Sequence, residues 1–392
     1  MKTKIIRTFT LMAFLLALAP AFFFTTYQLF LMDKGMSIFQ MSIINGVFML
    51  SVFILEIPTG ALADSFGRKL SIISGCLAWS LSFLLYYFSS SLPAFILAEI
   101  IGAGGSALIS GALEAWAVDS LCFHRSDISL EEFFRREEKF KQAGIIIGSF
   151  LGALIGSLNL SLPWLLSSAG MFGAALAAIF LMQEPYFKRQ SLNFSWRPIF
   201  IVAKESWQAG KNSPAFVRIA LTSAILAMSV QSLNMQWTIF FRTGFNMPMW
   251  SLGLIFSGIA ISAYLGARLA PLTAKKSRHE GRGLAIVFSF IGLMMIISGQ
   301  TNIFSLALIF FLSHELGRGL FAPLKKAIIN RRIKGQNRAT MLSLESMTVH
   351  AGAFFGLIGG GWLGKNYSIE TAWIVSGLIL LSFAPFLWKK GV

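Results

Sequence analysis

The sequence predicts an all-α polytopic membrane protein with twelve transmembrane helices in two six-helix bundles. Of its 392 residues, 55% are hydrophobic and only 13% are charged, whereas about 25% of the residues in a soluble domain are charged. Apolar stretches of about 20 residues, long enough to cross a bilayer core, recur along the chain. These stretches form two sets of six on either side of one polar segment.

The spans are expected in the order in which the apolar stretches occur. The first set lies near residues 9–31, 38–62, 70–90, 92–118, 141–160 and 163–182. The second set lies near residues 215–241, 250–272, 283–300, 302–328, 340–363 and 369–388. We therefore expect an N-terminal bundle over residues 1–183 and a C-terminal bundle over residues 215–392. The basic, proline-interrupted segment 184–214 is expected to be a cytoplasmic linker with an interfacial amphipathic helix.

Lysine and arginine predict the orientation of the chain. Most of the 33 cations fall in segments on the same side as the N-terminus, which the positive-inside rule places in the cytoplasm together with the C-terminus. The net charge of +16 therefore reflects topology, and we expect no nucleic-acid partner. The first span resembles a signal peptide, but its apolar run continues past Pro20 to Leu31, so we expect it to be retained. The expected location is a bacterial plasma or inner membrane, with the protein a monomer in the lipid bilayer.

The two halves also show a weak internal repeat. Gly102 and Gly104 in the fourth span correspond to Gly317 and Gly319 in the tenth. Repeats of this kind are typical of transporters that bind cargo between two similar bundles.

The segment GALADSFGRK, residues 60–69, follows the second span. Gly60 and Gly67 allow a close approach of helices and a tight turn. Asp64 is suited to accept hydrogen bonds from a helix N-terminus, and Arg68 offers a fork for carboxylates. With Asp119 at the end of the fourth span and the start of the eleventh span near Asn337, these residues predict a cytoplasmic gate. The alternative is an ordinary basic loop with a turn.

This segment resembles the loop signature of the major facilitator superfamily of transporters, Gly-x-Leu-x-Asp-x-x-Gly-Arg-Lys, at every position. The segments Glu56–Gly60 and Arg318–Leu344 look like the drug-and-metabolite exporter branch of that superfamily. The resemblance implies the major facilitator fold, in which two bundles rock around a midplane cavity. It implies neither the cargo nor the direction of transport.

Ionisable side chains within the spans are the candidates for coupling, because burying a charge in a membrane is costly. Glu114 is the first candidate for proton uptake and release, and Glu56 is the second. Glu56 has an alternative role as partner of a backbone group freed by Pro58. Counted along one continuous helix, Glu99 and Glu114 lie on the same face.

Several polar side chains are expected to bind the substrate, with hydrogen bonding between helices as the alternative. A structural Glu315–Arg318 pair is a further alternative, with Glu99 as another possible partner of Arg318. The candidates are Tyr27, Gln28, Glu99, Gln231, Asn234, Glu315 and Arg318.

Four other ionisable residues have simpler interpretations. Arg268 is expected to extend its charge to the membrane surface. Glu345 is suited to pair with a loop cation, and His314 to hydrogen-bond within its helix. His350 is either a packed polar residue or a proton carrier.

The predicted function is secondary active transport by alternating access, as a proton-coupled antiporter that exports an amphipathic or hydrophobic compound. The alternatives are proton-coupled transport of a polar or acidic metabolite such as a siderophore, and a receptor that binds ligand without moving it. No phosphate-binding loop, catalytic triad or metal-ligand spacing occurs in the sequence, so we expect no enzymatic activity, no cofactor and no metal.

Overall fold

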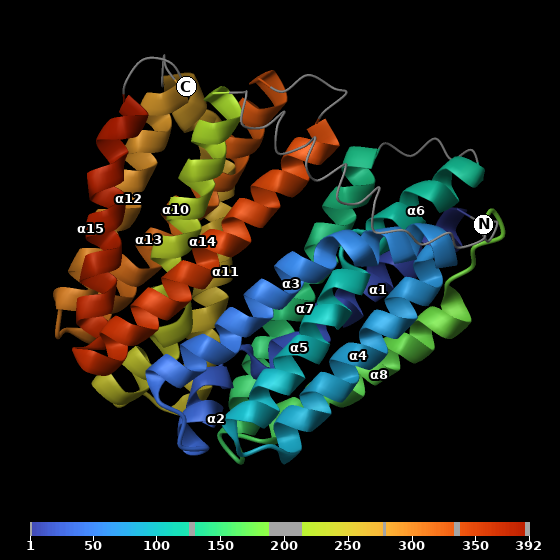
Figure 1. Cartoon of the computed structure of the whole chain (residues 1–392), viewed down its shortest axis with the longest axis horizontal. Coiled ribbons are helices and arrows are strands. Elements are labelled where there is room, and N and C mark those ends of the chain that lie inside the picture. The colour runs from blue at the N-terminus through green and yellow to red at the C-terminus, as the bar shows by residue number, and fades with distance from the viewer. Residues whose placement is uncertain (1, 125–129, 188–213, 277–279, 333–337, 389–392) are drawn as a thin grey trace. The chain divides into compact units, whose positions relative to one another are not determined.

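A computed structural model describes residues 2–124, 130–187, 214–276, 280–332 and 338–388 (Figure 1). Every regular element in these ranges is a helix. The predicted linker helix and Asn337 lie outside the described residues. The first half contains α1 (Lys2–Phe24), α2 (Tyr27–Asp33), α3 (Ile38–Phe66), α4 (Arg68–Phe88), α5 (Leu92–Ile109), α6 (Ala112–Phe123), α7 (Leu130–Gly156) and α8 (Leu162–Leu181). The second half contains α10 (Pro214–Ile239), a π-helical turn (Phe240–Gly244), α11 (Met249–Lys276), α12 (Glu280–Gln300), α13 (Phe304–Arg332), α14 (Arg338–Asn366) and α15 (Ile369–Trp388).

Within the described residues, ten spans are long and apolar enough to cross a membrane. They correspond to ten of the twelve expected spans. The other two expected spans fall on α7 and α14, which contain 27 and 29 residues. At 1.5 Å per residue each of these helices is about 40 Å long, enough to cross a bilayer core. The first three turns of α7 are rich in charged residues, and α14 contains Arg338, Glu345, His350 and Lys365, so both helices have a lower mean hydropathy.

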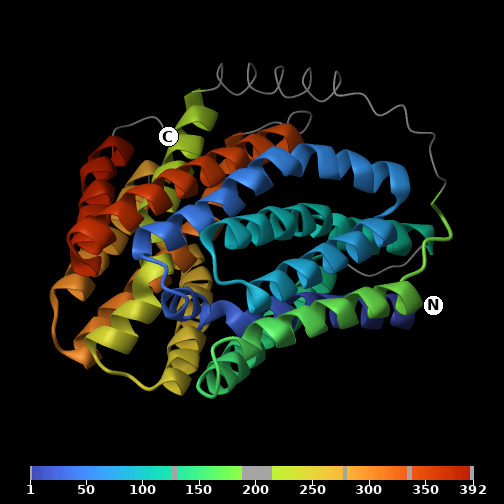
Figure 2. The same ribbon diagram turned by 60° about the horizontal axis from the view of Figure 1, so that its bottom comes forward.

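The chain divides into two compact units. Unit 1 comprises Met1–Gly35, Leu50–Ser195 and Pro248–Phe256, and unit 2 comprises Met36–Met49, Trp196–Met247 and Ser257–Val392. The start of α3 therefore belongs to unit 2, and the start of α11 belongs to unit 1. In unit 1, α4 packs against both α5 and α8, and α1 packs against α7 and α8 (Figures 1 and 2).

Two of the expected spans are interrupted. The first span breaks at Thr25 and Thr26, so that α2 begins at Tyr27. The fourth span breaks between α5 and α6, where Gly111 adopts a left-handed conformation with φ of 67°. The helical angle expected between Glu99 and Glu114 assumed one continuous helix and is wrong for this reason.

Glycines at every fourth position join one helix pair in each unit. In α7, a Cβ added at Gly144, Gly148 or Gly152 would lie no more than 2.7 Å from a carbonyl oxygen of α1. In α14, a Cβ added at Gly352 or Gly356 would likewise lie less than 2.7 Å from a carbonyl oxygen of α10. Small residues at this spacing let helices approach closely in a membrane. These two glycine contacts, of α7 with α1 and of α14 with α10, form a second internal repeat at spans five and eleven, which the sequence analysis missed.

Candidate functional site

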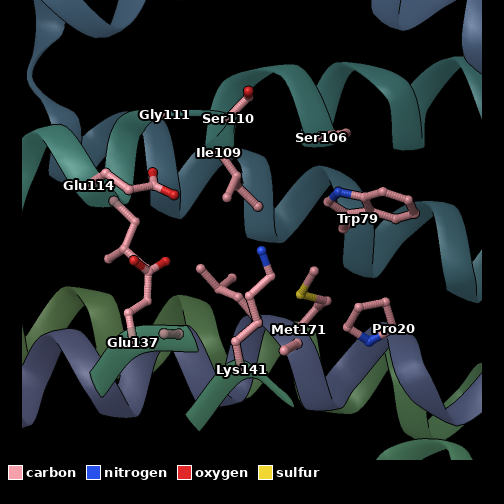
Figure 3. A pocket seen from close by; sticks show the side chains of 14 residues that line it. Pro20, Trp79, Ser106, Ile109, Ser110, Gly111, Glu114, Glu137, Lys141 and Met171 are labelled. Carbon is pink, nitrogen blue, oxygen red and sulfur yellow. The ribbon is translucent and has the colours of Figure 1, made fainter. Parts of the chain in front are cut away.

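The described structure contains four groups of polar residues that include sequence-predicted site residues, three in unit 1 and one in unit 2. The first is a cavity of about 400 Å³ inside unit 1 (Figure 3). Its walls are largely apolar and come from α1, α4, α5, α6, α7 and α8. The lining residues include Pro20, Trp79, Ile109, Met171, Glu114, Glu137 and Lys141.

The break between α5 and α6 places Glu114 at this cavity. Because α6 starts at Ala112, Glu114 lies in its first turn, where a carboxylate is favoured by the helix dipole. Glu137 and Lys141 are one turn apart on α7. Figure 3 shows the carboxyl groups of Glu114 and Glu137 directed toward each other and the Lys141 amine projecting into the same space.

The two carboxyl groups affect each other electrostatically. Partial burial, followed by the charge of Glu114, raises the pKa of Glu137 to about 7, and Lys141 opposes this rise. Glu137 precedes the predicted span 141–160 and was missed by the sequence analysis, because it stands in an ordinary charged stretch. Glu56, the second coupling candidate, is half-buried in α3 and does not line this cavity.

The second group lies where α8 ends, next to the signature segment. One carboxylate oxygen of Glu184 accepts a hydrogen bond from the Lys69 backbone N–H at 3.0 Å, and the Arg68 backbone N–H also bonds this carboxylate. Glu184 therefore caps the N-terminus of α4, a role the sequence analysis had suggested for Asp64 at another helix. Gly67 has a φ of 99°, and a Cβ there would lie 2.8 Å from the second Glu184 oxygen. The signature glycine thus leaves room for this cap.

Tyr186 connects the same region to α6. Its hydroxyl donates to the Trp116 carbonyl at 3.1 Å and lies 3.2 Å from the Ser120 hydroxyl. Burial raises the pKa of Tyr186 to about 12; the charges of Glu184 and Asp119 add to this rise and Arg68 opposes it. Two of the residues predicted for the gate, Arg68 and Asp119, thus lie in one electrostatic cluster. Gly60 and Asp64, the other two gate residues in this segment besides Gly67, lie in α3, but the structure does not describe the contacts of their side-chain positions.

Removing the Glu184 cap is expected to destabilise the protein. The Glu184→Ala variant leaves the first amide groups of α4 without this acceptor, a change that costs about 1 kcal/mol for comparable caps. Thermal unfolding in detergent should therefore begin at a lower temperature than in the wild type. Glu138→Ala is the matched control, because Glu138 is exposed. Equal midpoints for the two variants would contradict the capping role.

The third group lies in unit 2 and joins α10 to α13. Arg318 donates through Nη1 to Asn234 at 2.9 Å and to Glu315 at 2.6 Å. Asn234 in turn donates to Gln231 at 3.1 Å. Four of the predicted substrate-binding residues therefore form one hydrogen-bonded chain. The Arg318 side chain is 29% exposed, whereas that of Glu315 is 6% exposed.

His314 extends this group into the core of unit 2. Its Nδ1 bonds the Phe311 carbonyl within α13, as expected from the sequence, and its Nε2 lies 3.5 Å from Glu315. Glu345 pairs with Lys325 at 2.7 Å, so it does have a cationic partner, but this cation lies in helix α13 and not in a loop as expected. Arg268 is exposed on α11, and His350 is half-buried on α14.

The remaining predicted substrate-binding residues lie in unit 1. Tyr27 and Gln28 are buried at the start of α2, and Glu99 is buried on α5. Tyr27 donates a hydrogen bond to Glu99 at 2.8 Å. Within the described residues, no three His, Cys, Asp or Glu side chains are grouped so that they could hold a metal ion.

The sequence profile of the Major Facilitator Superfamily matches residues 9–128 and 281–391. The chain belongs to this superfamily of transporters. It is a secondary transporter, a multi-pass membrane protein and not an enzyme. The predicted family and fold class are confirmed, while the coupling ion and the termini's orientation stay predictions.

Three known proteins show how far the likeness extends. The MFS-type transporter YxaM of Bacillus subtilis is 24% identical, covering 94% of this chain and 93% of YxaM. The quinolone resistance protein NorA of Staphylococcus aureus is 19% identical, covering 96% of this chain and 94% of NorA. The crystal structure of the nucleoside transporter NupG matches with a TM-score of 0.80 at 14% identity, over 99% of this chain and 100% of NupG. At this identity the structural match establishes the fold and leaves the cargo open.

Proposed function

We propose that this transporter exports a small amphipathic or hydrophobic compound in exchange for protons. The observation that carries the proposal is the Glu114–Glu137 pair in the cavity of unit 1. Glu137 holds its proton more readily than an isolated carboxyl group, because burial and then the charge of Glu114 disfavour its ionisation. The apolar walls of the cavity suit a compound with a hydrophobic body. NorA, a distant relative, is named for quinolone resistance, which supports export.

Glu137 gives this proposal an observable pH dependence. With a pKa near 7, Glu137 is neutral at pH 6 and ionised at pH 8. Because the pKa of Glu137 is higher in the folded than in the unfolded protein, its protonation stabilises the fold. This contribution to stability is fully present below the unfolded-state pKa of about 4.3 and is lost as the pH rises through 7. We therefore expect the thermal midpoint to fall between pH 6 and 8 more steeply in the wild type than in Glu137→Gln.

The Glu114→Gln variant refines this test. It removes the charge that raises the pKa of Glu137, so the fall in the thermal midpoint should move to lower pH. Both titrations use purified full-length protein in detergent. Identical pH profiles for the wild type, Glu137→Gln and Glu114→Gln would show that the two carboxyl groups are not coupled.

Transport itself is tested in proteoliposomes of defined orientation. A pH gradient is imposed, and a panel of amphipathic, hydrophobic and acidic compounds that includes a quinolone is offered from either side. If export is coupled to protons, the compound should accumulate on one side of the membrane only when protons flow down their gradient toward the opposite side. Binding of a compound without movement across the membrane would support the receptor alternative.

A second candidate function is transport of an acidic metabolite. The observation that favours it is the partly exposed Arg318, whose hydrogen bonds to described residues are made by Nη1. An arginine fork with unused donors is suited to a carboxylate or phosphate group of the cargo.

A further inference from the structure

Glu99 lies in a closed aromatic cage within unit 1. Its side chain is buried, with 6% of the residue exposed. The Tyr27 hydroxyl donates to its Oε1 at 2.8 Å, and the Tyr86 hydroxyl donates to the same oxygen at 2.5 Å. Each phenol has one proton, so both available hydroxyl protons are directed to a single carboxyl oxygen.

The cage leaves no room for a cargo molecule beside Glu99. The Tyr86 ring stacks on Trp164 with ring centroids 4.0 Å apart, and Phe95 lies 5.1 Å from Tyr86. Phe30, Phe95, Tyr86 and Trp164 are all at most 1% exposed. The substrate-binding role expected for Glu99 would require these rings to move, whereas a proton needs no additional space.

Among the residues that the structure describes, no cation lies beside Glu99 to balance an ionised carboxylate. The titratable groups that face it are Tyr27 from α2 and Tyr86 from α4. Neither the rest of α5 nor α8 contains an ionisable residue, and the charged residues of α2 and α4 lie at the far ends of those helices.

A carboxylate buried in this way is costly, and protonation removes the cost. The acid form also fits the hydrogen bonds, since Oε1 accepts both phenols and Oε2 is left to carry the proton. The break at Thr25 and Thr26 places Tyr27 at the first position of the short helix α2. A shift of α2 would therefore remove one donor from Glu99 and open the cage.

We propose that Glu99 is a proton-binding site, separate from the Glu114–Glu137 pair, that holds its proton while Tyr27 and Tyr86 close the cage. Moving Tyr27 away with α2 admits water, and the carboxylic acid then releases its proton as a hydrated ion. The site's part in the transport cycle rests on the proton coupling proposed above. The proton site itself is argued from the geometry around Glu99 and does not depend on that coupling.

Infrared difference spectroscopy of the full-length protein in lipid bilayers tests the site directly. The wild type should show the carbonyl stretching band of protonated carboxylic acid at neutral pH. Glu99→Gln should lack the contribution of Glu99 to this band, whereas the contribution of Glu137, whose pKa is about 7, stays in both proteins. Glutamine has the shape and neutrality of the acid form, so the variant is expected to fold. Tyr27→Phe should keep the band but move it to higher frequency, because the carbonyl oxygen accepts one hydrogen bond fewer.

The control variant is Glu114→Gln, which should retain the Glu99 band. The same carbonyl absorption in the wild type and Glu99→Gln would overturn the proposal, as would a Tyr27→Phe band at unchanged frequency. Proton movement in proteoliposomes is measured in parallel. A Glu99 band in a protein that moves no protons would refute the coupled transport and leave the proton site standing, whereas coupled transport without the band would refute the site alone.

Discussion

Replacing Glu114 by glutamine is expected to abolish uphill transport while leaving downhill exchange measurable. A pH difference of one unit supplies about 1.4 kcal/mol per proton, which supports an accumulation of about tenfold for one proton per cycle. Without an ionisable group at position 114, the gradient cannot act through the Glu114–Glu137 pair. The accumulation ratio in proteoliposomes should therefore fall from about ten to about one.

The structure provides a matched control for this experiment. Glu138 is adjacent to Glu137 but exposed, and its carboxylate accepts a hydrogen bond from Gln142 at 2.7 Å. Glu138→Gln removes a negative charge from the same helix at a residue that does not line the cavity, and the charge of Glu138 is the smallest of the causes that shift the pKa of Glu137. Gradient-driven transport should therefore persist. Full accumulation by Glu114→Gln would exclude Glu114 as the coupling residue, and the same measurement on Glu56→Gln would then test the second candidate.

The sequence was sufficient to predict the fold because lipid imposes simple requirements on the chain. Each span must be about 20 residues long and apolar, and cations collect on one side. Pairs of residues one turn apart on the same helix could also be predicted from the sequence. Glu315 and Arg318 are three residues apart, as are Gln231 and Asn234, and both pairs are hydrogen-bonded in the structure.

The cavity of unit 1 was much harder to predict. The run around Ser110 and Gly111 is apolar on average, so its hydropathy does not indicate that the helix stops there, and the Ser-Gly dipeptide is the local signal that was missed. The break decides where Glu114 points, and Glu137 becomes its neighbour only through the packing of α7. Glu184 presents the same difficulty, since the amide groups it caps lie 115 residues earlier in the chain. Contacts over such separations depend on tertiary packing, which helical periodicity does not encode.

Substituting Arg318 is expected to weaken the binding of acidic compounds far more than that of neutral analogues. A hydrogen bond to a charged group contributes about 1.5–3 kcal/mol, so Arg318→Ala should lower the affinity for acidic members of one compound series by about ten- to a hundredfold. Arg318→Lys keeps the charge but loses the planar fork, and it should restore only part of the affinity. Equilibrium binding to the purified variants measures the difference.

The geometry in unit 2 explains why these variants separate a cargo contact from a structural pair. Nη1 of Arg318 is already held by Asn234 and Glu315, which orient the guanidinium while leaving part of the side chain exposed. If the pair were purely structural, Arg318→Ala would leave Glu315 buried without its cation and weaken the binding of all compounds alike. Restoration of binding by the double variant Arg318→Ala with Glu315→Ala would then follow, because the uncompensated charge is removed. A selective loss of acidic compounds that the double variant does not restore is the result expected if Arg318 contacts the cargo.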